Sequence, residues 1–235
     1  FALEAAYKSQ KTVGTIPTIS RMLFQAAEQL RKQGEKSPQK FWAKMARRNV
    51  TWFKPWKKTL DWKPPHAKWF VGGKTNIAYN CLDKHLETRG DQTAIIWEGD
   101  DPSKDKKITY GELHADVNRF ANVLKSRGVK KGDRVSIYMP MIPEAVVAML
   151  ACTRVGAVHS IVFSAFSPDA LKDRILDSDC ECVITSDQSI RGGKRLPLKP
   201  NADKGLAHCP KVHTCIVVKH GGDPVDWTEG RDVWY

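Results

Sequence analysis

The middle of the chain, residues 133–199, alternates between short apolar runs and longer segments with helical spacing of apolar positions. The apolar runs lie at 135–139, 158–163 and 182–185. Strand, helix, strand, helix, strand is the order typical of a parallel sheet with crossover helices. Ligands of such sheets bind beyond the carboxyl ends of the strands. We therefore predict an α/β fold with its binding site at those ends.

The first part of the chain has a different pattern. Apolar spacing predicts a helix over 19–33, closed by Gly34, and a second one that begins after the cap Ser37-Pro38 and runs to 48. The composition then shifts to a Trp- and Pro-rich stretch. Five tryptophans fall within 28 residues, with three prolines among them: Trp42, Trp52, Trp56, Trp62 and Trp69, and Pro55, Pro64 and Pro65. We interpret this stretch as an irregular arm pinned to the main body by its indoles, neither sheet nor helix. Stacking of these indoles on nucleic acid is the alternative.

Further elements are predicted on either side of the central region. A helix is expected over 76–88, and two strands over 92–98 and 106–109 around a charged turn. Thr109 and Glu112 have the spacing of a capping box, which opens a helix with a continuous apolar stripe. After the central region we expect a short helix over 201–208 and a strand over 214–218. We divide the chain into an N-terminal part, 1–75, and a truncated α/β part, 76–235.

Composition narrows the partners and the compartment. The chain has 235 residues and a net charge of +12, which indicates an anionic partner. On charge alone, nucleic acid, a membrane surface and a polyphosphate cofactor all remain possible. No apolar run is long enough to span a bilayer, and we expect no membrane partner. The cysteines form no CxxC pair, which favours free thiols in a reducing compartment, the cytoplasm or the mitochondrial matrix. His208, Cys209, His213 and Cys215 match no common zinc spacing and indicate a turn entering a strand. The chain starts with Phe and ends without a stop signal, so we expect a piece of a longer polypeptide.

Candidate chemistry centres on a basic loop. The predicted loop 186–195, after the third apolar run, ends in Arg191-Gly192-Gly193-Lys194-Arg195 and is suited to phosphate. A solvated basic loop is the alternative interpretation. The chain has no GxxxxGK[ST], GxGxxG or HExxH motif, and we predict no catalytic residue and no metal ligand within it.

Several strings resemble acetyl-coenzyme A synthetase of the acyl-adenylate-forming superfamily. The longest, at 138–156, reads YMPMIPEAVVAMLACTRVG. The others lie at 52–56, 60–62, 68–73, 76–83, 94–98, 120–124, 163–171, 191–197 and 227–234. The resemblance covers nearly all of the chain after residue 36. It is specific because the Trp-rich arm and the long central string occur together.

The resemblance implies a reaction in two halves. Acetate attacks the α-phosphate of ATP, with Mg2+ as cofactor, to give acetyl-adenylate, and the thiol of coenzyme A (CoA) then displaces AMP. The Ser/Thr/Gly-rich ATP loop, the acetate pocket and the C-terminal lysine of this family have no match in the chain. We therefore expect an N-terminal fragment of an acetate–CoA ligase, inactive alone, whose partners are acetate, ATP, CoA and the remainder of its own polypeptide.

The resemblance also assigns a site for the nucleotide end of CoA. It implies that Arg191 and Lys194 contact the 3′-phosphoadenosine, with Gly192 and Gly193 between them, and that Phe163, Leu196 and Pro197 form the wall for the adenine. Relatives often carry two glycines after the phenylalanine, where this chain has Ser164-Ala165. The added side chains affect the adenine wall more than the phosphate contact.

Two rival functions stay open at this point. A synthetase for propionate or another short acid would have the same features, because the residues that size the acyl pocket have no match here. A self-standing basic RNA-binding module would use the Trp/Lys arm and the positive charge. The interruption of the arm by prolines and the lack of an RNP-like or OB-like pattern favour the ligase without a nucleic-acid partner.

Overall fold

The computed structural model describes residues 16–235, with side chains described from residue 20. The chain forms two compact units that divide between Thr75 and Asn76. None of the helices within the described range combines the length and the apolar character needed to cross a lipid bilayer.

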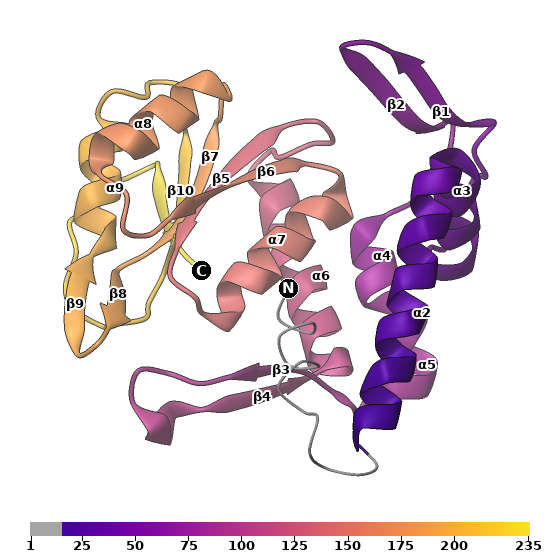
Figure 1. Cartoon of the computed structure of the whole chain (residues 1–235). Coiled ribbons are helices and arrows are strands. Elements are labelled where there is room, and N and C mark those ends of the chain that lie inside the picture. Colours follow the sequence, from indigo (N-terminus) through magenta and orange to yellow (C-terminus); the bar gives the residue numbers. More distant parts are fainter. Residues whose placement is uncertain (1–15) are drawn as a thin grey trace. The chain divides into compact units, whose positions relative to one another are not determined.

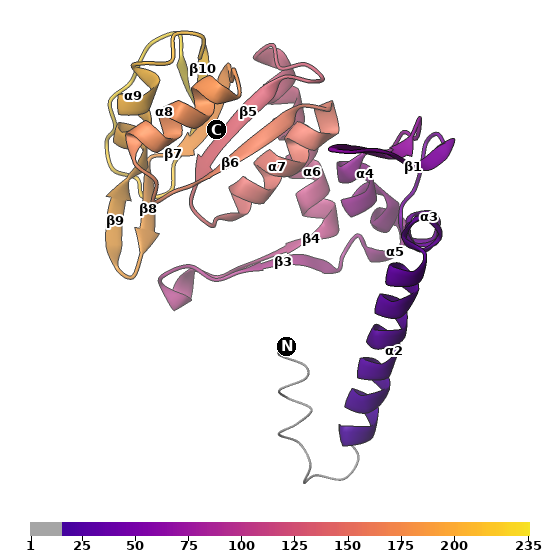
Figure 2. The ribbon, with the colours of Figure 1, turned by 45° about the horizontal axis from the view of Figure 1, so that its top comes forward.

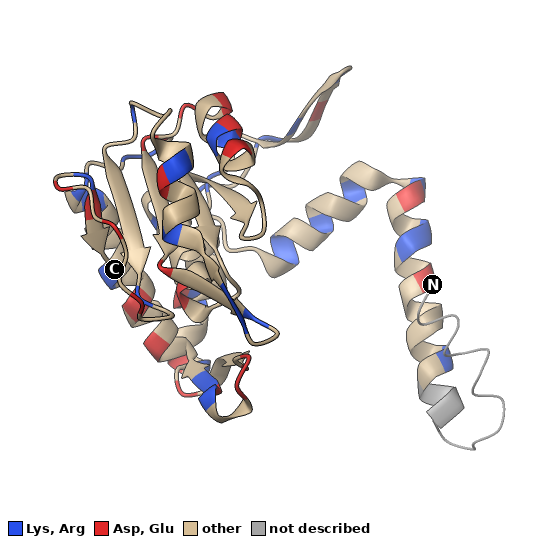
Figure 3. Ribbon diagram, turned by 90° about the vertical axis from the view of Figure 1, so that its left-hand side faces the viewer, with Lys and Arg blue, Asp and Glu red and all other residues tan. Residues whose placement is uncertain are grey.

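The N-terminal unit begins with the two predicted helices, α2 (Ile16–Lys36) and α3 (Pro38–Asn49). Helix α2 continues past Gly34, where the sequence analysis ended it. Ser37 makes no side-chain capping hydrogen bond, so the predicted side-chain cap is wrong, although Pro38 does occupy the first helical position. Basic residues recur along α3, which contains no Asp or Glu (Figure 3).

The Trp- and Pro-rich stretch contains regular structure, which corrects the prediction of an arm without sheet. Strands β1 (Lys58–Lys63) and β2 (His66–Val71) form an antiparallel hairpin. The two prolines lie in the turn between Lys63 and His66, where a missing N–H group breaks no ladder hydrogen bond. The rings of Trp52, Trp56 and Phe70 pack together with centroids 4.8–5.4 Å apart. The indoles therefore stabilise this unit internally.

The second unit opens with a broken helix instead of the single helix expected over 76–88. It consists of α4 (Ile77–Cys81), the 3-10 turn η1 (Asp83–His85) and α5 (Leu86–Arg89). The Asn76 side chain caps α4 by accepting a hydrogen bond from the backbone of Tyr79. The break falls at Leu82, whose φ of −123° lies outside the helical range.

The predicted strand pair and capping box are confirmed. Strands β3 (Thr93–Trp97) and β4 (Lys106–Thr109) are antiparallel, with the short 3-10 turn η2 (Pro102–Lys104) between them. Thr109 and Glu112 cap α6 (Tyr110–Ser126) reciprocally, each side chain accepting from the backbone of the other. Such a box satisfies two N–H groups that the first turn of a helix leaves free.

A five-stranded parallel sheet forms the centre of this unit, as predicted (Figures 1 and 2). Its order is β11-β10-β7-β5-β6. The strands are β5 (Arg134–Met139), β6 (Val158–Phe163), β7 (Cys182–Ser186), β10 (Thr214–Val218) and β11 (Asp232–Trp234). The crossover helices are α7 (Pro143–Val155) and α8 (Pro168–Asp177), and α9 (Leu198–Leu206) begins three residues before the predicted helix over 201–208.

Alternation along the strands divides the core into two layers. On β5, Val135 and Ile137 pack in the layer that contains α6 and α7, whereas Tyr138 faces the layer that contains α8 and α9. On β7, Ile184 and Val183 divide in the same way. This period of two, with apolar residues on both sides, is what a parallel sheet buried on both faces requires.

A buried ion cluster ties the last strand to α9. The Nζ atom of Lys199 lies 2.7 Å from Asp203 and 2.9 Å from Asp232, and the side chains of Lys199 and Asp232 are fully buried. Arg231 pairs with both aspartates, at 2.6 and 2.7 Å. Burial acts to raise the pKa of Asp232, but the hydrogen bonds from Arg231 and Lys199 outweigh it and the pKa is lowered.

All six cysteines are free thiols, and only Cys81 is exposed. Burial raises the pKa of Cys152 and of Cys215 to about 12, so both are protonated at neutral pH. Cys209 and Cys215 lie in the core beside α9. Within residues 16–235, no three His, Cys, Asp or Glu side chains are grouped in a way that could hold a metal ion.

Candidate functional site

The basic segment predicted as a loop over 186–195 is a β-hairpin. Strands β8 (Gln188–Arg191) and β9 (Lys194–Pro197) pair antiparallel around a two-residue turn. The turn residues Gly192 and Gly193 have φ angles of 57° and 72°. A two-residue hairpin turn of this kind needs positive φ at both positions, and glycine adopts it without steric cost. The pair of glycines thus creates the hairpin.

The hairpin register sorts the predicted site residues onto two faces. Arg191 is directly opposite Lys194, and Leu196 lies two residues further along the same strand. Directly opposed residues and residues two apart share a face of an antiparallel pair, so these three side chains lie together. Arg195 and Pro197 alternate with them and lie on the other face.

The basic residues of the hairpin differ in their partners. Arg195 donates to Asp223 at 2.9 Å and to the Gln188 side chain at 3.3 Å. In the part of the chain that the structure describes, neither Arg191 nor Lys194 makes a side-chain hydrogen bond or an ion pair, and both are exposed. Like charges directly opposite each other destabilise a strand pair. A bound anion would relieve this repulsion, which makes the face of Arg191 and Lys194 a candidate anion site.

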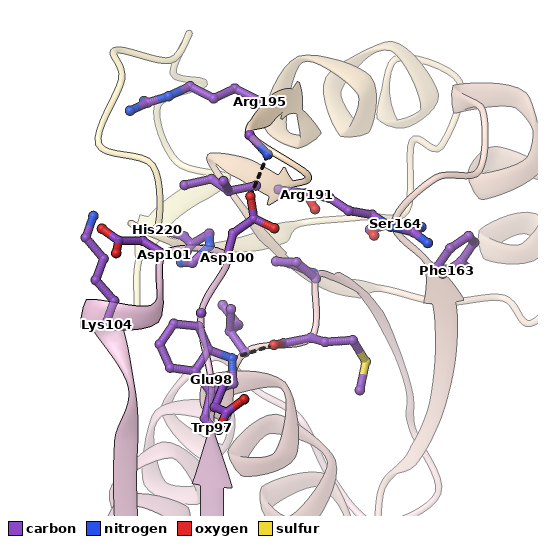
Figure 4. Close-up of a pocket in the computed structure, with 17 residues that line it drawn as sticks. Trp97, Glu98, Asp100, Asp101, Lys104, Phe163, Ser164, Arg191, Arg195 and His220 are labelled. Atoms are coloured by element: carbon purple, nitrogen blue, oxygen red, sulfur yellow. Dashed lines mark hydrogen bonds between the residues drawn. The ribbon is translucent and has the colours of Figure 1, made fainter.

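An open pocket of about 760 Å3 lies beside the hairpin (Figure 4). Its lining includes residues that follow β5 and β6, namely Met141 and Ser164, and His220, which follows β10. This is the carboxyl-end position expected for a ligand of a parallel sheet. Of the predicted site residues, Phe163, Arg191 and Gly193 line the pocket, whereas Gly192, Lys194, Leu196 and Pro197 lie outside its lining.

Phe163 stands at the end of β6 and the side chain of Arg191 extends toward it (Figure 4). Phe163 is 52% exposed, and its ring packs edge-on against that of Phe166, with centroids 5.9 Å apart. The hydroxyl of Tyr138 donates to the carbonyls of Ser164 and Phe166, at 3.1 and 2.8 Å. These hydrogen bonds from a buried residue hold the loop after β6 in place. The exposed ring of Phe163 therefore has a fixed position, with the Arg191 side chain extending toward it.

Asp100, in the loop between β3 and β4, was missed by the sequence analysis. Gly192 N donates to Asp100 Oδ1 at 2.8 Å, and Gly193 N donates to Oδ2 at 2.6 Å. These two hydrogen bonds lower the pKa of Asp100. The contact joins segments far apart in sequence, and no local pattern announces it.

A second aspartate, Asp187, supports the hairpin from its base. Its buried carboxylate accepts hydrogen bonds from the backbone nitrogens of Gln188, His220, Gly221 and Gly222, at 2.6–3.0 Å. The loop after β10 is thereby fixed to the start of β8. Four backbone donors satisfy the carboxylate without a cation, which is why it tolerates burial.

Family models match most of the chain. Residues 82–234 match the family described as AMP-binding enzyme, and residues 27–81 match the acetyl-coenzyme A synthetase N-terminus. The chain therefore belongs to the AMP-binding enzyme family, which agrees with the α/β fold and with a pocket beyond the strand ends.

Within that family the chain is similar to acetyl-coenzyme A synthetases. The protein of that name from Magnetococcus marinus is 60% identical over 210 residues, which cover 88% of this chain and 33% of that protein. Acetyl-coenzyme A synthetase 2 of Pseudomonas aeruginosa is 57% identical over 210 residues, again 88% and 33%. The acetyl-coenzyme A synthetase of Halorhodospira halophila is 53% identical over 223 residues, 94% of this chain and 35% of that protein. The chain thus spans about a third of the length of the curated relatives it matches.

Proposed function

We propose that the polypeptide containing this chain is an AMP-forming acetate–CoA ligase. It makes acetyl-CoA from acetate, ATP and CoA through an acetyl-adenylate. The observation that carries the proposal is 60% identity over 88% of the chain to a protein named acetyl-coenzyme A synthetase. Residues 76–235 would be the first α/β part of the large domain, and residues 1–75 its N-terminal helices and Trp/Pro-rich arm.

This chain's own part in the reaction would be to hold the nucleotide end of CoA. The 3′-phosphate and the diphosphate make that end strongly anionic. Arg191 can bond two phosphate oxygens at once through its planar guanidinium, and Lys194 adds a compact charge from the opposite strand. Phe163 and Leu196 would contact the adenine. The register puts Pro197 on the opposite face of the hairpin from Arg191, Lys194 and Leu196. Of the residues predicted to contact the adenine, Pro197 is therefore the least supported.

ATP and Mg2+ would bind mostly outside this chain. ATP would supply the phosphorus that acetate attacks, and Mg2+ would neutralise phosphate charge there. The proposed contribution of the hairpin is therefore confined to the second half-reaction, in which it would orient CoA for transfer of the acetyl group.

The test of this function is product analysis of the purified full-length polypeptide. Acetate, ATP and CoA should yield acetyl-CoA and AMP in equal amounts. Comparison of kcat/KM for acetate and propionate would decide between the acetate ligase and a ligase for a longer acid. ADP instead of AMP, or no acyl-CoA from either acid, would contradict the proposal.

We also propose that the 235-residue chain alone does not adenylate acetate. It matches only a third of its relatives, and it contains no Ser/Thr/Gly-rich phosphate loop. Acetate-dependent exchange between pyrophosphate and ATP should remain at background for this chain. Robust exchange would place the adenylation chemistry within these residues.

A further inference from the structure

The Asp100 carboxylate clamps the tip of the β8–β9 hairpin. Its two oxygens accept separate hydrogen bonds from Gly192 N at 2.8 Å and Gly193 N at 2.6 Å. Figure 4 shows the second of these contacts reaching from the β3–β4 loop to the turn. The contact is two-point, so it fixes both the position and the orientation of the turn.

The loop that carries Asp100 is itself anchored. The Trp97 indole N–H donates to the carbonyl of Met141 at 2.7 Å, and Asp101 accepts from the backbone of Ser103 at 3.0 Å. A Cβ on Gly99 would stand 3.1 Å from the Trp97 ring, so the chain is closely packed there. Asp100 is thus presented to the hairpin from a fixed loop.

Successive backbone N–H groups in such a turn form a concave site that attracts anions. Here the site is filled by a carboxylate of the protein. A phosphate of the coenzyme would therefore be bound by the side chains of Arg191 and Lys194, which emerge on either side of the turn. The orientation of both side chains depends on the backbone that Asp100 holds.

We propose that Asp100 is a positioning residue for recognition of the 3′-phosphate of CoA. It acts through the Gly192–Gly193 turn, whose orientation sets the directions of Arg191 and Lys194. This inference rests on the proposed function. If the carboxylate instead competed with phosphate for the N–H groups of the turn, its removal would lower the KM for CoA.

The experiment uses the full-length ligase and the variants Asp100→Ala, Asp100→Asn and Arg191→Ala. The control Asp105→Ala removes the same charge from the same loop, at an exposed position. The measurements are kcat and KM for CoA and for dephospho-CoA, the analogue that lacks the 3′-phosphate. Acetate-dependent exchange between pyrophosphate and ATP is measured as well. We expect Asp100→Ala to raise KM for CoA on the order of tenfold, as for loss of a charged hydrogen bond. KM for dephospho-CoA, kcat and the exchange rate should stay within twofold.

Asp100→Asn keeps one acceptor oxygen and should give an intermediate KM, and Asp105→Ala should behave as the parent. An unchanged or lower KM for CoA in Asp100→Ala would overturn the positioning role. An equal rise of KM for CoA and dephospho-CoA would also overturn it, because a merely structural defect does not discriminate between them. If Arg191→Ala raises the KM for CoA while Asp100→Ala does not, only the positioning role of Asp100 is overturned. If Arg191→Ala has no effect either, the proposed coenzyme site fails.

Discussion

The carboxylate of Asp187 lies 2.6 Å from the backbone nitrogen of Gly222 and accepts its hydrogen. Burial acts to raise the pKa of Asp187, but the N–H groups of Gly221, Gly222, His220 and Gln188 outweigh burial and the pKa is lowered. The loop after β10 and the base of the hairpin are therefore held by a group whose charge stabilises the fold.

Asp187→Asn should destabilise the protein by about 1–3 kcal/mol near neutral pH. The single amide oxygen of Asn cannot accept all the hydrogen bonds that the two carboxylate oxygens accept from four backbone N–H groups. The lowered folded-state pKa means that this stabilisation is fully present above the unfolded value of about 3.9. It is lost as the pH falls through the folded-state pKa. Urea unfolding of parent and variant at stepwise lower pH should show their difference shrinking. The exposed Asp91→Asn serves as control, and a difference independent of pH would contradict the assignment.

Lys199→Met should cost roughly 3–5 kcal/mol in free energy of unfolding, the usual effect of removing one partner of a buried ion pair. Asp232 would keep Arg231 but lose the ammonium that lies 2.9 Å from it. Urea unfolding of the purified protein measures the effect. Lys204→Met, an exposed lysine of the same helix, should change stability by no more than about 0.5 kcal/mol. Equal effects of the two variants would show that the cluster is not stabilising.

Under the proposed function, Arg191→Ala in the full-length polypeptide should weaken the binding of CoA by roughly 1.5–3 kcal/mol, the usual contribution of a charged hydrogen bond, or about ten- to a hundredfold. Pyrophosphate exchange should be nearly unchanged, and most of the preference for CoA over dephospho-CoA should disappear. Arg89→Ala is the control, because Arg89 is an exposed arginine that lies outside the pocket lining. Undiminished discrimination in Arg191→Ala would place the phosphate elsewhere.

We expect the isolated chain to bind a hydrophobic dye strongly, because its edge strand β6 exposes apolar side chains. Ile161 and Phe163 share one face of β6 and are 57% and 52% exposed. Apolar side chains grouped in this way mark surfaces that bind apolar groups. Ile161→Lys should reduce dye fluorescence, whereas Thr88→Lys, at an already polar exposed position, should not. Equal fluorescence of parent and Ile161→Lys would locate the dye on another surface.

The sequence predicts four strands of the parallel sheet, β5, β6, β7 and β10, because each is a short apolar run. Strand β11 has no such run and is not among the predicted elements. The capping box at Thr109 and Glu112 is equally local and is confirmed. Errors arise where tertiary contacts or turn chemistry decide. The helix over 76–88 breaks at Leu82, whose side chain is buried in the core. Around the prolines of the N-terminal arm, the sequence gives no alternation strong enough to reveal the β1–β2 hairpin.

The candidate site is predictable in part. A Gly-Gly pair between two short runs is a recognised signal of a two-residue hairpin, and it correctly implies that Arg191 and Lys194 are neighbours across the turn. The prediction of a loop over 186–195 is therefore wrong on a local feature, the Gly-Gly turn. The distinction between Arg191 and Arg195 depends on register, and the roles of Asp100 and Asp187 depend on contacts across the fold. Such long-range relationships leave no trace in local spacing.

The buried ion cluster has a consequence for synthesis of the chain on the ribosome. Lys199 emerges well before Arg231 and Asp232, and until then its ammonium has only Asp203 as a nearby carboxylate. Burial of an incompletely compensated charge is costly, so we expect the α9 side of the sheet to close fully only after Arg231 and Asp232 have emerged. Arrival of β11 supplies the missing carboxylate together with a second cation. We therefore expect β11 to complete the packing of α9 against the sheet during synthesis.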